Sequence, residues 1–222
     1  MSTLVITGTD TEIGKTHVTC GLVRSLQRRG VDVGVFKPFC SGSRDDVVQL
    51  QAAARCADTL DEINPCCFRR PLAPYRAAEL EKRPVDLAAV LAAYDVIRHR
   101  HEHVLVEGVG GLMVPLCDGP EGVYCFRDFC GDMAACVVIV AARVLGTINH
   151  TWLTVDACRA AGLEVRGVVF NDATPVAPGE PACSNPDMIA RCAGVAVLGC
   201  VPHGTQDEAW DALTDACFAG LN

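Results

Sequence analysis

The sequence predicts an α/β protein, a single domain over residues 1–222 with a doubly wound, mostly parallel sheet. Three observations lead to this fold class. Short apolar runs rich in valine and isoleucine recur along the chain, amphipathic segments lie between most of them, and the first run leads into a glycine-rich loop. Continuous apolar runs are typical of strands buried on both faces of a parallel sheet. Alternation of strand and helix places ligand sites at the carboxyl ends of the strands.

The predicted elements alternate along the chain. The first strand, residues 4–7, leads through the glycine-rich loop into a helix at 15–29, which carries Leu22 and Leu26 on one face. The other predicted strands are the apolar runs at 31–36, 103–106, 136–141, 165–170 and 195–199. The other predicted helices cover residues 44–56, 86–98, 149–161 and 186–193. Residues 174–186 contain four prolines and are predicted to be a surface loop.

The bulk composition limits the classes of partner. A chain of 222 residues suffices for one well-packed domain, and its net charge of −8 disfavours nucleic acid or an anionic membrane as the main partner. The longest uncharged apolar run, residues 133–142, is about half as long as a membrane span. Residues 1–10 lack the charge and apolar core of a signal peptide. We therefore expect a cytoplasmic protein, with its 14 cysteines reduced.

The glycine-rich loop contains a variant of the phosphate-loop motif. Residues 7–17 read TGTDTEIGKTH, so five residues separate Gly8 from Gly14, where the usual motif has four. The loop's N–H groups and the helix N-terminus direct partial positive charge at a phosphate. Lys15 is placed to reach the β and γ phosphates, and the Thr16 hydroxyl to bind Mg²⁺. The strand–loop–helix context favours this interpretation over a chance Gly-Lys-Thr at a helix start.

Two carboxylates are candidates for completing a magnesium site. Glu107 ends the apolar run of VLVEGVGG, residues 104–111, which places its carboxylate at the carboxyl edge of the sheet. The alternative is a strand-end glutamate that faces water. Asp46 lies in SRDDVV, at the start of a predicted helix, where a carboxylate also stabilises the helix dipole without any other role.

One lysine at a strand end is a candidate catalytic residue. Only three of the 19 basic residues are lysine, namely Lys15, Lys37 and Lys82. Lys37 follows the second predicted strand directly, so a compact ammonium would lie at the carboxyl edge of the sheet. The alternative is a surface lysine whose stem covers apolar neighbours. The histidine-rich run HRHEH, residues 99–103, resembles a metal patch but is predicted to be a solvated turn.

Five segments occur in a characteristic order: GTDTEIGKT, KPFCSGS, VEGVGG, LGTINHT and VVFNDATP. Together they resemble the dethiobiotin synthetases, ATP-dependent enzymes of the P-loop NTPase fold that act before the sulfur step of biotin synthesis. The resemblance covers roughly residues 3 to 205. It implies that the longer phosphate loop is the variant used by this family of ligases.

The resemblance implies a role for each matching residue. It identifies Lys37 as the active-site lysine, with Lys15 as a second catalytic lysine. It implies that the metal contacts are Thr16, Asp46 and Glu107. It implies substrate contacts at Thr11, Ser41, Gly146, Thr147, Ile148 and Asn149. It implies that ATP is bound by Glu12, Ile13, Gly14, Lys15, Thr16, His17, Asp46, Glu107, Gly108, Val109, Gly110, Asn171, Asp172, Pro202, His203 and Gly204, the last five of them near the adenine base.

The resemblance also implies a reaction and its partners. The substrates would be 7,8-diaminononanoate, CO₂ or bicarbonate, and ATP with Mg²⁺. One amine takes up CO₂ to give a carbamate, the carbamate attacks the γ-phosphate, and the second amine closes the mixed anhydride to a cyclic urea. Family members are homodimers, so the GTIN segment, residues 146–149, is expected to meet substrate across the dimer interface.

The strongest alternative is a switch ATPase of the partition or maturation kind, which acts through protein partners. Such proteins carry a second lysine early in the loop, at the position where this chain has Asp10. A GTP-dependent switch is disfavoured because no N-K-x-D motif follows a late strand. A cobyrinate-type amidating ligase is disfavoured because 222 residues leave no room for a glutaminase half.

Overall fold

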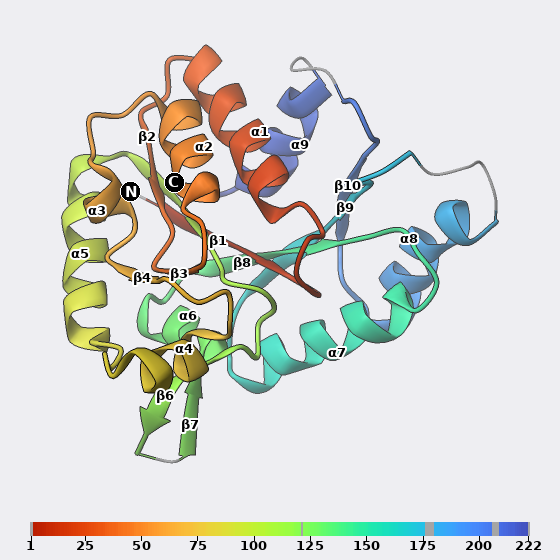
Figure 1. Cartoon of the computed structure of the whole chain (residues 1–222). Helices are drawn as coiled ribbons and strands as arrows, with labels where there is room; N and C mark the ends of the chain where they lie inside the picture. The colour runs from red at the N-terminus through yellow and green to blue at the C-terminus, as the bar shows by residue number, and fades with distance from the viewer. Residues whose placement is uncertain (1, 121, 176–179, 206–208, 222) are drawn as a thin grey trace.

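A computed structural model describes residues 2–120, 122–175, 180–205 and 209–221. Its centre is a six-stranded sheet in which every pair of neighbouring strands is parallel (Figure 1). The strands, in sheet order, are β10 (Val197–Val201), β9 (Val165–Asn171), β8 (Cys136–Ala141), β1 (Ser2–Gly8), β5 (His103–Glu107) and β2 (Val33–Phe36). All six apolar runs therefore contribute strands to one sheet, and the predicted fold class is confirmed.

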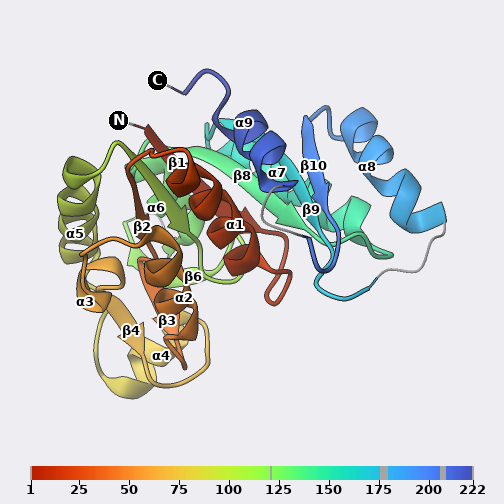
Figure 2. The same ribbon diagram turned by 90° about the horizontal axis from the view of Figure 1, so that it is seen from above.

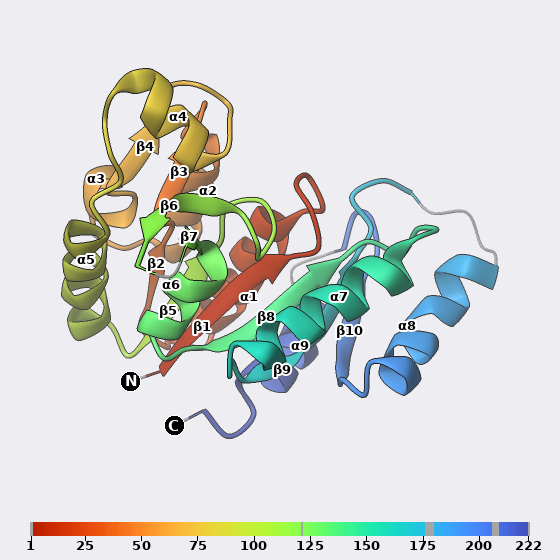
Figure 3. The same cartoon turned by 90° about the horizontal axis from the view of Figure 1, so that it is seen from below.

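Helices cover both faces of this sheet. Figure 2 shows α1, α2 and α9 on one face, and Figure 3 shows α5, α6 and α7 on the other. The helices are α1 (Lys15–Arg28), α2 (Asp45–Ala54), α3 (Leu60–Ile63), α4 (Pro74–Glu81), α5 (Leu87–Arg100), α6 (Phe126–Asp132), α7 (Thr147–Ala160), α8 (Glu180–Cys192) and α9 (Trp210–Phe218). No helix in the described part of the chain combines the length and apolar character needed to cross a bilayer.

The core consists of two apolar clusters separated by the sheet. Side chains alternate between the two faces of a strand, so Leu4 and Ile6 of β1 pack against α1, α2 and α9, while Val5 belongs to the opposite cluster. Burying both faces explains why the strands are continuously apolar in sequence. Since all six strands run in the same direction, their carboxyl ends lie at one edge of the sheet, where the loops carry the predicted site.

Most predicted boundaries differ from the observed ones by one or two residues, and two elements are displaced in ways that have a physical cause. The last strand spans Val197–Val201 rather than 195–199, because its register is set by pairing with β9, with an irregularity between Val197 and Gly199. Helix α8 begins at Glu180, well before the predicted residue 186, and Pro186 lies inside it. The predicted surface loop is therefore wrong for residues 180–186, because the prolines there do not stop the helix. Residues 176–179 of the predicted surface loop lie outside the described residues.

Several further elements are too short for apolar periodicity in the sequence to predict them. A small parallel pair is formed by β3 (Phe39–Ser41) and β4 (Cys66–Phe68). An antiparallel hairpin is formed by β6 (Pro115–Gly119) and β7 (Gly122–Cys125). Both pairs lie at the carboxyl side of the main sheet, near β2 and β5 (Figure 3).

Candidate active site

The phosphate loop connects β1 to α1 with a backbone shape that suits an anion. Glu12 and Gly14 have φ angles of 57° and 85°, and Gly14 is the residue that precedes the first turn of α1. Left-handed residues alternating with right-handed ones turn successive N–H groups toward one side, which makes an anion-binding concavity. A Cβ on Gly14 would lie 2.2 Å from Nδ2 of Asn171, so glycine is required by both φ and space. The loop with its extra residue therefore has a backbone shape that suits an anion.

Lys15 is buried within this loop. The residue is 7% exposed, and Nζ donates a hydrogen bond of 2.8 Å to the carbonyl oxygen of Asp10. Burial lowers the pKa of Lys15 to about 8, although the carboxylate of Glu107 acts in the opposite direction. The loop therefore holds a lysine whose charge is poorly solvated, and a bound anion would stabilise that charge.

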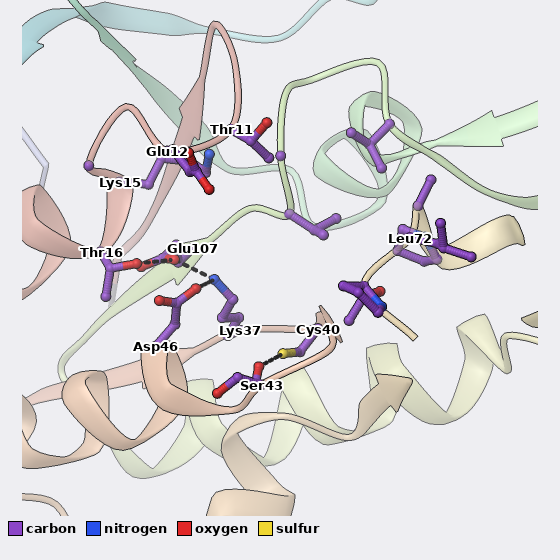
Figure 4. A pocket seen from close by; sticks show the side chains of 18 residues that line it. Thr11, Glu12, Lys15, Thr16, Lys37, Cys40, Ser43, Asp46, Leu72 and Glu107 are labelled. Atoms are coloured by element: carbon purple, nitrogen blue, oxygen red, sulfur yellow. Dashed lines mark hydrogen bonds and ion pairs between the residues drawn. The ribbon is translucent and has the colours of Figure 1, made fainter. Parts of the chain in front are cut away.

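A compact polar cluster lies next to the loop, at the ends of β2 and β5. Figure 4 shows Lys37 directed at Asp46 and Glu107, and Thr16 directed at Glu107. Lys37 Nζ is 2.5 Å from Glu107 Oε1 and 2.8 Å from Asp46 Oδ2, and Thr16 Oγ1 donates to Glu107 Oε1 at 2.9 Å. Four residues from separate elements therefore meet at the carboxyl edge of the sheet, where Lys37 and Glu107 follow or end their strands.

The charges in this cluster stabilise one another. Burial by itself would lower the pKa of Lys37, but the carboxylates of Glu107 and Asp46 outweigh burial and raise it above its ordinary value. Burial alone would likewise raise the pKa of Asp46, and the Lys37 ammonium lowers it instead. Lys37 is only 4% exposed, so it is an internal cation held by two carboxylates and not a surface lysine.

The same cluster fits a magnesium ion that is shared with a nucleotide. Oε2 of Glu107 is fully buried and has no hydrogen-bond partner among the described residues, which is costly unless a ligand contacts it. Carboxylate and hydroxyl oxygens are the ligands that Mg²⁺ prefers. No group of three or more His, Cys, Asp or Glu in the described chain could hold a metal by itself. Thr16, Asp46 and Glu107 therefore suit a metal that takes its remaining ligands from phosphates and water.

These residues open into a cavity of about 860 Å³. Ser41 lines it, and Ser41 Oγ is buried without a hydrogen-bond partner in the described structure. The wall also contains residues that sequence analysis did not single out, namely Cys40, Ser43, Pro71, Leu72, Ala73, Pro74 and Val114. The predicted residues in the lining are Thr11, Glu12, Gly14, Lys15, Thr16, Lys37, Ser41, Asp46, Glu107, Val109 and Gly110.

The predicted adenine-side residues lie at the ends of β9 and β10. Nδ2 of Asn171 donates to the Ile13 carbonyl at 2.9 Å, and Asn171 Oδ1 is buried without a partner in the described structure. Asp172 is held by a two-pronged ion pair with Arg143. Beside them is a second cavity of about 360 Å³, lined in part by Pro202, His203 and Gly204. Gly108 packs closely against Phe126, and His17 contacts the ring of Trp210.

The GTIN segment does not line the main cavity. Gly146 precedes α7 with a φ of 92°, Thr147 is buried, and Asn149 is exposed. The preceding residues Val144 and Leu145 are 53% and 93% exposed, respectively. Within one chain, therefore, this segment is separate from the other predicted substrate residues Thr11 and Ser41.

The predicted solvated turn at HRHEH is only partly correct. The run includes the end of α5, and His101 is largely buried between two carboxylates, with Nδ1 2.9 Å from Asp32 and Nε2 2.8 Å from Asp58. Arg100 contacts Asp58 as well. Burial opposes the charge of His101, but the two carboxylates raise its pKa above the ordinary value. The run therefore belongs to a structural ion-pair network that joins the end of α5 to Asp32, the residue before β2, and to Asp58.

Comparison with known proteins decides the family. A family profile described as an AAA domain matches residues 2–208. The ATP-dependent dethiobiotin synthetase BioD of Akkermansia muciniphila is 39% identical over 97% of this chain and 99% of its own length. The protein of the same name from Bacillus licheniformis is 42% identical over 91% of this chain and 86% of its own length. The chain belongs to the ATP-dependent dethiobiotin synthetase family.

Solved structures support the fold. The MinC:MinD cell division protein complex of Aquifex aeolicus matches 98% of this chain and 94% of its own with a TM-score of 0.57 and 14% identity. The ParA family ATPase of Chlorobium tepidum matches 98% of this chain and 91% of its own with a TM-score of 0.56 and 10% identity. At these identities the similarity concerns the fold alone, and it does not extend the activity of these ATPases to the present chain.

Proposed function

We propose that this protein catalyses the ATP-dependent carboxylation and ring closure of 7,8-diaminononanoate with CO₂, which yields dethiobiotin, ADP and phosphate. It would act as a single ligase domain over residues 1–222 in the cytoplasm. The observation that carries the proposal is the convergence of Lys15, Lys37, Thr16 and Glu107 on one cavity, in a chain belonging to this family. A phosphate loop, a buried second cation and two carboxylates are the parts that phosphoryl transfer to a charged acceptor requires.

The nucleotide triphosphate would lie across the phosphate loop. N–H groups around Gly14 and the N-terminus of α1 would bind the β-phosphate, and Lys15 would exchange its contact with the Asp10 carbonyl for a phosphate oxygen. Oδ1 of Asn171 is an unpartnered buried acceptor on the adenine side of the loop, suited to an amino group of the base. Mg²⁺ held by Thr16, Asp46 and Glu107 would neutralise charge on the β and γ phosphates.

The chemistry begins with the diamine. One amine nitrogen forms a bond to the carbon of CO₂ and loses a proton, which gives a carbamate. A carbamate oxygen then attacks the γ-phosphorus, the bond to ADP breaks, and a carbamic-phosphoric anhydride forms. The second amine attacks the carbamate carbon and loses a proton to the departing phosphate or to water, phosphate leaves with the bonding electrons, and the five-membered urea closes.

Lys37 has the position and the charge for the central step. Its ammonium, on the floor of the cavity, would neutralise both the carbamate and the transferring phosphoryl group, a contact that strengthens as charge develops. The raised pKa keeps Lys37 protonated at neutral pH, so it acts as an electrostatic catalyst rather than a base. Ser41, with its unpartnered buried hydroxyl, would contact the diamine or its carbamate.

Among the described residues of the cavity lining, the basic side chains are Lys15 and Lys37, which the phosphates would engage, so the substrate carboxylate needs a further binding site. The N-terminus of α7 at Thr147 could bind this carboxylate, but the GTIN segment is absent from the cavity lining. A homodimer that places residues 146–149 of one chain over the cavity of the other would resolve this separation. The exposed apolar side chains of Val144 and Leu145, next to that segment, fit burial at such an interface.

The test is phosphate release from Mg·ATP and bicarbonate, measured with and without 7,8-diaminononanoate. We expect release to depend on the diamine, with one dethiobiotin formed per phosphate. Lys37→Gln should lower kcat about 100-fold while changing ATP affinity little, because a transition-state contact is lost. Lys82→Gln, an exposed lysine outside the cavity, is the matched control and should leave both unchanged. Slow phosphate release that ignores the diamine would instead favour a partner-dependent switch ATPase.

A further inference from the structure

A fully buried asparagine lies behind the active-site lysine. Asn64 follows the short helix α3, which lies beside β2 at the edge of the sheet (Figure 1), and its side chain is 0% exposed. Nδ2 of Asn64 donates a 2.6 Å hydrogen bond to the carbonyl oxygen of Lys37. The preceding carbonyl, of Ile63, accepts the backbone N–H of Lys37 at 2.9 Å. Both backbone polar groups of Lys37 are therefore held by residues 63 and 64.

These bonds replace contacts that the sheet does not make. The pairing of β2 with β5 ends at Phe36 and Val106, one residue before Lys37. The buried backbone of Lys37 would otherwise lack partners, which is energetically costly. The position from which the Lys37 side chain extends is thus determined by Ile63 and Asn64 rather than by the main sheet.

The other end of the Asn64 amide is attached to the helix that carries Asp46. Oδ1 of Asn64 accepts from Nε of Arg44 at 3.1 Å, and the Asn64 carbonyl oxygen accepts from another nitrogen of the same guanidinium at 2.9 Å. Arg44 is the residue before the first turn of α2, and Asp46 lies within that turn. The guanidinium is further oriented by Asp61, at 2.7 Å.

The contacts form a closed circuit. It runs from the Lys37 backbone to Asn64, from Asn64 to Arg44, along α2 to Asp46, and back through the 2.8 Å bond between Asp46 and the Lys37 ammonium. We propose that Asn64 and Arg44 are positioning residues, which hold Lys37 and Asp46 in the relative geometry that phosphoryl transfer requires. We call these two residues the Asn64–Arg44 brace. The inference rests on the proposed function only for the catalytic role of Lys37.

The bond from Asn64 to the Lys37 carbonyl and the bonds from Arg44 to Asn64 can be tested separately by substitution. Asn64→Asp keeps the shape and the acceptor for Arg44, but it replaces the donor to the Lys37 carbonyl by a second acceptor. Arg44→Lys keeps the charge but lacks the planar fork that reaches two oxygens of Asn64 at once. Arg44 is partly exposed, so this second variant tests the brace even if Asn64→Asp folds poorly.

The decisive measurement is the effect of Asn64→Asp in two backgrounds. In the otherwise unchanged enzyme we expect kcat to fall about 10- to 100-fold, as for a misplaced catalytic group, with little change in KM for ATP. In the Lys37→Gln background the same substitution should have a much smaller effect, because the ammonium that the brace positions is gone and only Asp46 remains to be displaced. Arg44→Lys should follow the same pattern with a smaller loss. Losses that multiply with that of Lys37→Gln, or unchanged kcat in both variants, would overturn the inference.

A control variant in α3 and a chemical-labelling measurement that does not depend on activity accompany these assays. Thr59→Ala removes the capping box of the same helix α3 but leaves the bonds of Asn64, so it should lower the unfolding midpoint without changing kcat. Lysine acylation mapped by mass spectrometry compares Lys37 with exposed Lys82 in each protein. We expect Lys37 labelling, relative to Lys82, to rise at least severalfold in Asn64→Asp and to stay unchanged in Thr59→Ala.

The two proposals fail in different ways. If the unsubstituted enzyme does not use the diamine, the proposed function fails, and unchanged labelling of Lys37 in Asn64→Asp still overturns the brace. If the enzyme makes dethiobiotin and both brace variants do so at the full rate, the brace alone is wrong.

Discussion

At the contact between α1 and α9, replacing one glycine by alanine has two opposing effects on stability, a gain in helix propensity and a loss from steric overlap. Gly21 lies in the middle of α1, and a Cβ placed on it would lie 2.3 Å from Cδ2 and 2.4 Å from Cε2 of Trp210. Trp210 is 1% exposed and its ring also contacts His17, in the first turn of α1. Gly21→Ala therefore tests whether α9 packs as closely on α1 as the structure indicates.

Helix propensity alone predicts that Gly21→Ala stabilises the protein by about 1 kcal/mol. The overlap acts in the other direction. Carbon atoms need roughly 3.5 to 4 Å, so the indole must move by more than about 1 Å within a close-packed core. Overpacking of this kind costs about 1 to 3 kcal/mol or more. Since Trp210 is only 1% exposed, we expect the overlap cost of about 1 to 3 kcal/mol to outweigh the propensity gain of about 1 kcal/mol, with a net loss of up to about 2 kcal/mol.

The assay is urea unfolding followed by circular dichroism. Gly131→Ala in α6 is the matched control, because a Cβ there meets nothing within 4 Å, and it should be neutral or stabilising by up to about 1 kcal/mol. In a Trp210→Leu background the overlap is relieved, so Gly21→Ala should become stabilising. Equal or greater stability of Gly21→Ala in the native background, at an unchanged m-value, would refute the close packing of α9 on α1.

Three further predictions concern charge and assembly. The value of kcat/KM for ATP should fall as pH rises through about 8, because the buried Lys15 ammonium then loses its proton. In Lys15→Arg this fall should occur at a higher pH. His101→Asn should lower the free energy of unfolding more at about pH 5.5 than at about pH 9. Asp32 and Asp58 raise the pKa of His101, so its charged form stabilises the folded protein, and this stabilisation is lost as pH rises. Equal losses in urea unfolding at both pH values would contradict this. Leu145→Asp should convert the expected homodimer to a monomer by light scattering and lower turnover, whereas an unchanged mass would exclude this surface from the interface.

The local chemistry of the site could be predicted from sequence because it depends on strand ends. Lys37 and Glu107 each follow or end a buried run, and parallel strands bring their carboxyl ends to one edge. Gly14, Lys15 and Thr16 belong to one continuous motif whose function depends on local backbone shape. Because these positions depend on strand ends and on one local motif, the sequence indicates that they lie at the same edge of the sheet without any knowledge of loop paths.

The supporting residues could not be predicted in the same way. Asn64 and Arg44 carry no motif, and their contacts join segments up to 27 residues apart through a loop path that periodicity does not reveal. The cavity wall at residues 71–74 likewise follows a short strand whose pairing is set by tertiary contacts. Nothing in the sequence of residues 71–74 indicates which surface the segment covers.

By itself the sequence determined the class of fold, the phosphate loop and the charged residues at the strand ends, because apolar periodicity and local motifs act over a few residues. Only the tertiary structure decided the order of the strands, the shift of β10, the burial of His101 between two carboxylates and the circuit through Asn64. These features depend on strand register and on close packing between distant segments. Their stabilisation is the sum of many weak contacts, so no single short pattern in the sequence predicts them.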